Sequence, residues 1–246
     1  MAAEISVAMA AYQGEKYLPT QLDSILSQLG GDDEVVVSYD PSTDGTLEVL
    51  QGYARRDPRV RVVENGRPGV TGNFNNAIAH CTGRYIYISD QDDQWRPGKV
   101  ETVQRTFRET GCCLVIHNAI HTDENLNPVG EPFSQMYRMG GRLRDIWKPR
   151  MSGCCMAFTR EMKDILLPIP EIHGYDQWIA LVCQFWGSAA YPEEILLYHR
   201  LHGGNVTQGR RPLRVILPMR AKLLACLGLR GLRQLKRRLF GGGGRL

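Results

Sequence analysis

Long apolar segments are missing from this chain of 246 residues. It contains no uninterrupted run of about 18 apolar residues, so the sequence predicts no transmembrane helix. The residues after Met1 do not form a basic region followed by an apolar one, as a secretory signal would. We therefore expect a cytoplasmic protein, either free or held peripherally at the inner face of the cytoplasmic membrane.

Paired metal-binding cysteines are also missing. The seven cysteines are an odd number and include no C-x-x-C pair, so neither a disulfide framework nor a zinc site is predicted. Cys112–Cys113 and Cys154–Cys155 are adjacent pairs, which form disulfides only with strain. We expect the cysteines to be small buried apolar residues in a reducing compartment.

Acidic residues are absent from the C-terminal segment. Of the 30 Lys and Arg residues, eleven lie in residues 209–246, whereas all 26 Asp and Glu residues precede this segment. The chain therefore combines an acidic body with a basic tail, and the two parts need separate explanations.

Apolar runs alternate with amphipathic segments in the first half of the chain. We predict strands at 5–12, 33–40, 59–65 and 83–89, separated by helices at 15–29, 42–56 (with Ser42 or Thr43 as N-cap) and 72–81. Strands and helices that alternate at this spacing are typical of βαβ units, so we expect an α/β fold with a mainly parallel sheet over residues 1–120.

The second half has a less regular pattern. We predict a helix that begins after Pro97 and runs to about Thr110, one strand over 112–121, another over 152–159, a helix over 175–187 and a final strand over 193–205. We therefore expect one domain over residues 1–208, with a first half at 1–120 and a second half at 121–208, followed by the tail at 209–246.

Polar residues follow three of the predicted strands. They are Tyr12–Gln13, Asp40 and Asp90–Asp93. In open parallel sheets, ligands bind beyond the carboxyl ends of the strands. The three groups therefore predict a binding site at one edge of the sheet.

The sequence "YIYISDQDDQW" places three aspartates within four positions, at Asp90, Asp92 and Asp93. An EF-hand loop starting at Asp90 does not fit, because Trp95 occupies the position that needs glycine. A solvated turn is one remaining explanation. The other is Mg²⁺ or Mn²⁺ holding a diphosphate, since Mg²⁺ takes one or two carboxylates together with substrate phosphates.

Seven blocks of the sequence resemble, in order, those of family 2 glycosyltransferases over about residues 4–208. Within this family, the chain most resembles a group that includes bacterial rhamnosyltransferases. Members of this group carry an S-D-Q-D-D-x-W block. The resemblance implies a GT-A fold with a nucleotide-binding half and a smaller acceptor-side half. It also implies inverting sugar transfer from a nucleotide diphosphate sugar with a divalent metal, Mg²⁺ or Mn²⁺. The blocks are "AMAAYQGEKYLPTQLDSILSQ", "VVVSYDPSTDGT", "GVTGNFNNAI", "GRYIYISDQDDQWRPGKV", "SGCCMAFTREM", "YDQW" and "LLYHRLHGGNV".

The resemblance also implies roles for single residues. Asp40 would bind the nucleotide base, Asp90 the ribose region and Asp92 the metal. Asp176 would take the place of the general base. His202 would lie near the diphosphate or serve as a second metal ligand. The other implied residues are Ala11, Tyr12, Asn73, Gln91 and Arg200 on the nucleotide-sugar side and Trp95, Gly153 and Trp178 on the acceptor side.

The chemistry of sugar transfer needs such residues. Departure of a diphosphate from an anomeric carbon develops negative charge, which a metal and an arginine stabilise. The acceptor hydroxyl must lose a proton during attack, which suits a carboxylate across the pocket. A single in-line displacement inverts the configuration.

Some positions depart from the family pattern. Tyr39 and Pro41 flank Asp40 where an acidic and a small residue are usual, Gln13 replaces a common Asn, and Tyr175 precedes Asp176 where His or Glu is usual. The choice of nucleotide is therefore left open.

Several assignments have structural alternatives. Asp176 could cap a helix, and His202 could close a turn. Trp95 and Trp178 could be core aromatic residues rather than sugar platforms.

The tail mixes leucines with basic residues at helical intervals over residues 210–240. This composition is typical of an interfacial helix on an anionic membrane surface. Packing of a solvated helix on the body is the alternative. We expect no nucleic-acid binding, because aromatic residues do not alternate with the basic ones and no reading motif is present.

The sequence thus favours an inverting glycosyltransferase that adds a sugar, such as a rhamnose-like deoxysugar, to a lipid-linked or cell-surface glycan precursor. Two alternatives stay open: the same fold with a UDP-hexose or UDP-GlcNAc donor, and a non-catalytic nucleotide-sugar-binding protein.

Overall fold

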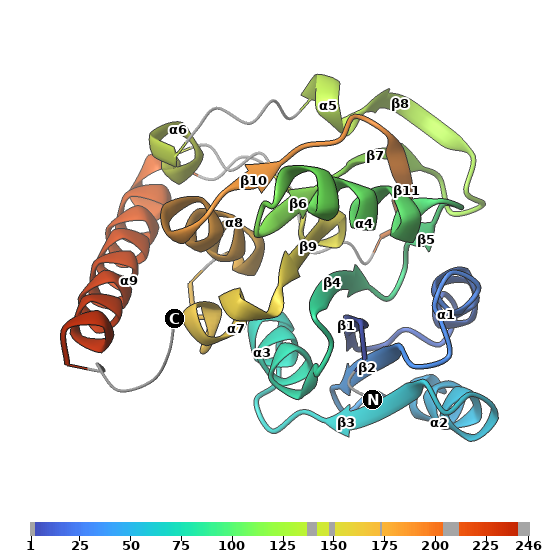
Figure 1. Cartoon of the computed structure of the whole chain (residues 1–246). Helices are drawn as coiled ribbons and strands as arrows, with labels where there is room; N and C mark the ends of the chain where they lie inside the picture. The colour runs from blue at the N-terminus through green and yellow to red at the C-terminus, as the bar shows by residue number, and fades with distance from the viewer. Residues whose placement is uncertain (1–2, 137–141, 148–150, 173, 204–211, 241–246) are drawn as a thin grey trace.

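The computed structural model describes residues 3–136, 142–147, 151–172, 174–203 and 212–240. The predicted α/β fold is confirmed: two sheets are flanked by helices, and the larger sheet is rich in parallel strands (Figure 1). Strands and helices alternate from β1 to α4, as the sequence predicts.

The larger sheet has seven strands, and its parallel part is the predicted one. β3, β2, β1 and β4 run parallel to one another, while β9 lies antiparallel between β4 and β6. The buried apolar runs of β1 and β2 fit a sheet that is covered on both faces. The spatial order is β10 (Ala189–Ala190), β6 (Leu114–Ile116), β9 (Met156–Thr159), β4 (Tyr85–Asp90), β1 (Ile5–Ala11), β2 (Glu34–Tyr39) and β3 (Val60–Glu64).

The smaller sheet has four strands and begins directly after the aspartates. Its order is β5 (Gln94–Trp95), β11 (Ile195–Arg200), β7 (Asn118–Thr122) and β8 (Pro128–Pro132). The prediction of one strand over 112–121 is wrong, because the chain leaves the larger sheet at His117 and enters the smaller one. The ring of His117 is buried at this crossing, and its Nδ1 lies 2.8 Å from the carbonyl oxygen of Asn118.

Helices pack around both sheets. They are α1 (Leu18–Leu26), α2 (Thr46–Arg56), α3 (Val70–His80), α4 (Lys99–Thr110), α5 (Phe133–Met136), α6 (Arg142–Trp147), α7 (Arg160–Leu166), α8 (Tyr175–Trp186) and α9 (Leu213–Phe240), with a 3₁₀ turn at Gly153–Cys155. Within the parts of the chain named above, no helix is both long enough and apolar enough to cross a bilayer.

The predicted N-cap of the second helix is wrong. α2 begins at Thr46, and the carboxylate of Asp44 accepts a hydrogen bond from its backbone nitrogen at 3.2 Å. The hydroxyls of Ser42 and Thr43 instead accept bonds from the backbone nitrogen and side chain of Gln13, at 3.0 and 2.9 Å. They therefore brace the loop that follows β1.

The cysteines are placed largely as the sequence suggests. All seven cysteines are free, and five of them are buried. α9 lies along one side of the molecule next to α6 and α8 (Figure 1). The larger sheet takes strands from both sides of residue 120, so the two halves of the body share it.

Candidate functional site

The carboxyl ends of β1, β2 and β4 meet at one edge of the larger sheet, as predicted. β1 lies between the other two strands, with Ala11 opposite Tyr39 and Ala10 opposite Asp90. The residues that follow these strands therefore share one edge, where open parallel sheets bind ligands.

Gln91 joins the ends of β4 and β1. Its Oε1 accepts a hydrogen bond from the backbone nitrogen of Tyr12 at 2.8 Å, and its Nε2 donates to the carbonyl oxygen of Tyr12 at 2.6 Å. This arrangement requires Gly14, because a Cβ atom there would lie 2.2 Å from Oε1 of Gln91. Gln91 thus fixes the loop after β1 and leaves the exposed ring of Tyr12 at the rim of the site.

Asp40 is buried at the end of β2 and holds a neighbouring loop. Its carboxylate accepts hydrogen bonds from Nδ2 of Asn65 at 2.5 Å and from the backbone nitrogen of Gly69 at 2.9 Å. Asn65 and Gly69 were not identified from the sequence as parts of the site. Their contacts fix the shape of the corner where the resemblance places the nucleotide base.

Asn73 reaches the same corner from α3. Its Nδ2 donates to the carbonyl oxygen of Ala11 at 3.2 Å. Its Oδ1 is buried and has no hydrogen-bond partner among the residues that the structure describes. A buried acceptor without a partner costs about 1–3 kcal/mol, which a ligand donor at this position would offset.

Asp92 meets the far end of the chain through the smaller sheet. Nε2 of His202 lies 2.7 Å from Oδ2 of Asp92, and Nε of Arg200 donates to the carbonyl oxygen of Asp92 at 2.8 Å. The guanidinium of Arg200 and the ring of His202 both contact the ring of Tyr17, at 4.9 and 4.8 Å between centres. Tyr17 was not identified as a site residue from the sequence.

Asp93 lies beneath this pair and is fully buried. Its Oδ1 lies 2.9 Å from Nδ1 of His199 and accepts a bond from the backbone nitrogen of Arg200 at 3.2 Å. Lys99 is also fully buried; its Nζ donates to the carbonyl oxygen of Cys154 at 3.1 Å. Asp93, His199 and Lys99 support the site. Of these three residues, only Asp93 was singled out from the sequence.

Burial and neighbouring charge shift the pKa values of the three aspartates. Burial raises the pKa of Asp90 well above its usual value, and the nearby Cys154 thiol and the other aspartates add to the effect. Burial and the charge of Asp93 also raise the pKa of Asp92, against the opposing influence of His202. Burial opposes the charge of Asp93 as well, but the charge and hydrogen bond of His199 outweigh it and lower the pKa of Asp93. A charged pair of Asp93 and His199 therefore lies next to two carboxyl groups whose pKa values are raised.

Tyr175 links the start of α8 to Asp90. Its hydroxyl lies 3.4 Å from Oδ1 of Asp90, and its ring stacks on Phe74 with 4.1 Å between centroids. Gly153 makes room for this hydroxyl, because a Cβ atom at Gly153 would lie 2.2 Å from it. The tyrosine that departs from the family pattern thus has a defined place against a strand-end aspartate.

Asp176 follows in the first turn of α8. Its Oδ1 accepts a hydrogen bond from the backbone nitrogen of Gln177 at 2.7 Å. Burial raises the pKa of Asp176 to about 6, although hydrogen bonds to backbone nitrogens oppose the shift. A carboxylate with this pKa accepts a proton more readily than an exposed one does.

The two tryptophans do not form sugar platforms. Trp178 is 0% exposed, and its Nε1 donates to the carbonyl oxygen of Leu166 at 3.0 Å. Trp95 is 2% exposed, and Nζ of Lys99 lies 4.1 Å from its ring centroid. The acceptor-side assignment is corrected for both residues, because their rings are covered by protein.

Among the residues that the structure describes, two groups of side chains could hold a metal ion. The first is Asp92 with His202, whose oxygen and nitrogen donors suit Mg²⁺ or Mn²⁺. The second is Asp93, Cys154 and His199, whose ligand atoms lie within 4.8 Å of one another. A thiolate favours softer ions, and His199 already contacts Asp93, so the first group fits Mg²⁺ or Mn²⁺ better.

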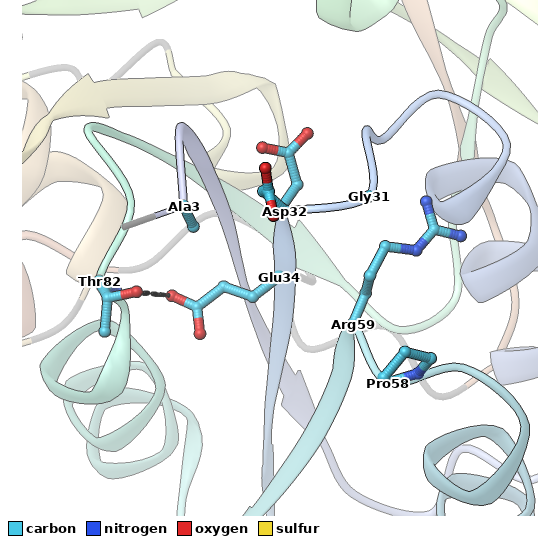
Figure 2. A pocket seen from close by; sticks show the side chains of 8 residues that line it. Ala3, Gly31, Asp32, Glu34, Pro58, Arg59 and Thr82 are labelled. Carbon is cyan, nitrogen blue, oxygen red and sulfur yellow. Dashed lines mark hydrogen bonds between the residues drawn. The ribbon is translucent and has the colours of Figure 1, made fainter. Parts of the chain in front are cut away.

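A second pocket lies at the opposite edge of the larger sheet, and its Glu34 carboxylate has a structural role. It lies at the amino ends of β1, β2 and β3, and Figure 2 shows the carboxylate of Glu34 bonded to Thr82 there. Glu34 also accepts a bond from Oγ of Ser6 at 2.6 Å and pairs with Arg61 at 3.0 Å. This carboxylate therefore links neighbouring strands of the sheet.

The comparison with protein families identifies the chain. The model of glycosyl transferase family 2 matches residues 6–166, which include the strand-end aspartates and most of the larger sheet. The chain belongs to this family. The resemblance to family 2 is thereby confirmed, whereas the rhamnosyltransferase-like group is not.

Sequence relatives agree with this membership. The Bacillus subtilis protein TuaG, a glycosyltransferase named for teichuronic acid biosynthesis, is 33% identical over 217 residues, 84% of this chain and 82% of its own length. An uncharacterized glycosyltransferase of Nostoc is 26% identical over 82% of this chain and 66% of its own length. A chondroitin synthase of Pasteurella multocida is 32% identical over 133 residues, which are only 14% of that protein. The chain thus spans less than two thirds of the length of these last two relatives.

Solved structures show the same fold. Residues 1–349 of Staphylococcus aureus TarS, in complex with UDP-GlcNAc, align with a TM-score of 0.70 and 19% identity over 89% of this chain and 66% of that chain. A mannosyltransferase of Pyrobaculum calidifontis, in complex with GDP-Man and Mn²⁺, aligns with a TM-score of 0.63 and 19% identity over 93% of this chain and 76% of that chain. At these identities the likeness establishes the GT-A fold.

Proposed function

We propose that this family 2 member is an inverting, metal-dependent hexosyltransferase that moves a sugar from a nucleotide diphosphate sugar to a hydroxyl of a lipid-linked or cell-surface glycan precursor. One observation carries the proposal: Asp176, whose pKa is raised to about 6, directly follows Tyr175, whose hydroxyl lies 3.4 Å from the strand-end Asp90. A candidate base thus lies beside the candidate donor site.

The donor would bind along the strand ends. Tyr12 and Asn73 offer an exposed ring and a buried amide oxygen at the corner held by Asp40. Ala11 and Gln91 shape that corner through their bonds to Asn73 and Tyr12. Asp90 would then face the ribose.

The diphosphate would lie on the other side of the aspartates. Asp92 and His202 would hold Mg²⁺ or Mn²⁺, which supplies positive charge for the leaving diphosphate. Arg200, beside the same pair, would add a fixed positive charge. A mannosyltransferase of the same fold is in complex with Mn²⁺, which supports the choice of cofactor.

Asp176 would take the proton from the acceptor hydroxyl as that oxygen attacks the anomeric carbon. The bond from the anomeric carbon to the diphosphate oxygen breaks in the same step, so one displacement inverts the configuration. General-base catalysis of this kind contributes about 10²–10⁴-fold. Gly153 would serve the acceptor side by making room for Tyr175 next to this base.

The domain assignment follows the same plan. We keep residues 1–208 as the transferase domain, with the donor half at 1–120 and the acceptor half at 121–208, and residues 209–246 as the tail. Residues 137–141, 148–150 and 204–211, which belong to the acceptor half and its junction with the tail, lie outside the described parts.

The donor sugar has three candidates. A rhamnose-like deoxysugar follows from the S-D-Q-D-D-x-W block. UDP-GlcNAc or a UDP-hexose is supported by TarS, which is in complex with UDP-GlcNAc, and GDP-mannose by the mannosyltransferase. The relative named for teichuronic acid biosynthesis supports a cell-surface glycan as acceptor.

We also propose that residues 212–240, the described part of the 210–240 segment, contact the anionic inner face of the cytoplasmic membrane. Large apolar side chains are exposed along this segment, and it contains no acidic residue. Near such a surface each Lys or Arg contributes about 1 kcal/mol. The exposed side chains are Leu213, Val215, Leu217, Leu224, Leu229, Leu232, Leu235 and Leu239.

Flotation with anionic vesicles tests the membrane proposal. Replacing Leu224, Leu232 and Leu235 by Gln should abolish flotation, whereas neutral vesicles should bind the wild type weakly. Unchanged flotation of the triple variant would reject an apolar contact with the bilayer.

A transfer assay tests the function. Wild-type protein is incubated with Mn²⁺, labelled dTDP-, UDP- and GDP-sugars in separate reactions, and a membrane lipid extract as acceptor source. Sugar incorporation from one donor, lost in Asp176→Asn, is the expected result. If the protein binds a nucleotide but neither incorporates sugar into the acceptor nor hydrolyses any of the donors, the non-catalytic binding protein is favoured instead.

A further inference from the structure

Helix α9 is fastened to the body by two buried arginines. Arg220 is 8% exposed and Arg230 is 7% exposed, although both belong to the basic tail that the sequence assigned to a surface. The part of the tail that α9 forms therefore has an inner side that contacts the body, as well as the outer leucines.

The two arginines form hydrogen bonds with different parts of the body, although Arg230 also lies over the ring of Trp178 in α8, with its Cζ 5.3 Å from the ring centroid. Arg230 donates from Nη1 to the carbonyl oxygens of Ile165 and Leu167, at 2.7 and 2.6 Å, and from Nη2 to that of Pro168 at 2.8 Å. These acceptors lie at and directly after the C-terminal end of α7. Arg220 instead donates from Nη1 to Oε1 of Gln177 at 2.6 Å, and from Nη2 to the carbonyl oxygen of Trp147 in α6 at 3.4 Å.

Gln177 is the residue directly after the candidate base, and it is 1% exposed. Its Nε2 donates to the carbonyl oxygens of Asp145 and Ile146 in α6, at 2.7 and 2.9 Å. Its backbone nitrogen donates to the carboxylate of Asp176 at 2.7 Å. One glutamine thus connects α6, α9 and the base.

From this geometry we infer that Arg220 is a positioning residue for Asp176, so that the inner side of α9 is part of the catalytic scaffold while its outer side carries the proposed membrane contact. The inference rests on the proposed function, in which Asp176 is the base. Arg220 holds the Gln177 side chain, Gln177 fixes the first turn of α8, and that turn sets the direction of the Asp176 carboxylate. Without the guanidinium, Oε1 of Gln177 loses a charged donor in a buried place, and the turn can shift.

A small shift is enough to matter, because displacement of a catalytic group by about 1 Å can lower the rate by about 100-fold. Arg220 does not act through its charge in this account, since the groups that face Asp176 and set its pKa are its buried surroundings and backbone nitrogens. The effect expected is a change in rate with donor affinity preserved.

The test compares Arg220→Gln with Arg230→Gln, which removes the other buried guanidinium of α9. Arg230 lies over the ring of Trp178 but makes no hydrogen bond to Gln177, so its replacement leaves the Gln177 side-chain bonds in place. We expect Arg220→Gln to lower kcat by about 10- to 100-fold, and Arg230→Gln by less than about threefold. The Kd of the donor nucleotide should be the same in both variants, and both should lose thermal stability. If Arg220→Gln does not fold, Arg220→Lys, which keeps the charge with a shorter reach, should show a smaller loss of the same kind.

Equal losses of kcat in the two variants, or none in Arg220→Gln, would overturn the inference, because α9 would then act only through general stability. Amide hydrogen exchange gives a reading that does not depend on catalysis. The backbone N–H of Gln177 should exchange faster in Arg220→Gln than in Arg230→Gln. If this difference appears but the wild type transfers no sugar, the link to Gln177 holds and the proposed function fails; if exchange is equal, the positioning role itself is rejected.

Discussion

Nε2 of His202 lies 2.7 Å from Oδ2 of Asp92, although the two residues are 110 positions apart in the chain. The antiparallel pairing of β5 with β11 brings them together, because β5 starts directly after the aspartates and β11 ends at Arg200, two residues before His202. The smaller sheet thus completes the site that the larger sheet begins. β11 supplies the guanidinium of Arg200, and the segment that follows this strand supplies the imidazole of His202.

Removing the charge of Asp92 should weaken metal-dependent nucleotide binding. Hydrogen bonds to charged groups contribute about 1.5–3 kcal/mol, so Asp92→Asn should raise the Kd of the nucleotide diphosphate by about 10-fold or more in the presence of Mn²⁺. Asp164→Asn, at an exposed position of α7, is the matched control. Calorimetry measures both, and an unchanged Kd for Asp92→Asn would remove this residue from the metal site.

Replacing Asp176 should affect the chemical step alone. Asp176→Asn keeps the size of the side chain and loses the base, so kcat should fall by about 10²–10⁴-fold while the Kd of the donor stays the same. A variant with wild-type kcat would show that Asp176 is a helix-start residue and that the base lies elsewhere.

The rate should also depend on pH through Asp176. A general base acts only when deprotonated, and the pKa of Asp176 is raised to about 6. The wild-type kcat should therefore be constant above this pH and fall with decreasing pH below it, by about tenfold per pH unit. A kcat that stays constant down to about pH 4.5 would indicate a base with the usual pKa of an aspartate, about 3.9. It would contradict a pKa that burial has raised at the catalytic base.

Crowding Gln91 should disturb donor binding. In Gly14→Ala the new Cβ would lie 2.2 Å from Oε1 of Gln91, which must then release the backbone of Tyr12. The KM for the donor should rise by about 10-fold, the equivalent of about 1.4 kcal/mol. Gly31→Ala has no atom within 4 Å of the new Cβ and serves as control. Equal KM values in the two variants would argue against a donor site at the end of β1.

Glu34 gives a prediction about the fold alone (Figure 2). Burial alone would raise the pKa of Glu34, but hydrogen bonds from Ser6 and Thr82 outweigh it and lower the pKa below its usual value. A lowered folded-state pKa means that Glu34 stabilises the fold above its unfolded pKa of about 4.3, and that this contribution is lost as the pH falls through the folded value.

Glu34→Gln should therefore lower the free energy of unfolding at pH 7 by about 1–3 kcal/mol, and the difference from wild type should shrink as the pH falls below about 4. Urea unfolding at several pH values measures this, with Glu48→Gln on the surface of α2 as control. A difference that does not change with pH would contradict the assigned charge state.

The parallel part of the larger sheet could be predicted from sequence because β1 to β4 are regular apolar runs separated by helices with one apolar face. The split of 112–121 could not be predicted, since the seven apolar residues of this segment give no sign that they enter two sheets. β5 has only two residues, and β8 is exposed, so neither carries a periodic pattern.

The site was predictable where residues cluster in the chain, as in Asp90–Asp93, and not where distant residues pair. Nothing near His199 indicates Asp93 as its partner, and nothing near Arg220 indicates Gln177. The tryptophans were misassigned because an aromatic residue beside a motif can pack inward as easily as it can bind a sugar. Likewise a basic residue in an amphipathic segment can turn inward when carbonyl oxygens or an amide meet its guanidinium, as for Arg220 and Arg230.

The central claim is that the strand-end aspartates bind a nucleotide diphosphate through a metal ion. The most direct measurement is calorimetric titration with UDP, dTDP, GDP and ADP, each with Mn²⁺ and then with EDTA. We predict that one nucleotide binds with Mn²⁺ and that EDTA abolishes or strongly weakens this binding, which would also identify the base of the donor. Failure of all four to bind in the presence of Mn²⁺, or binding that EDTA leaves unchanged, would contradict the claim.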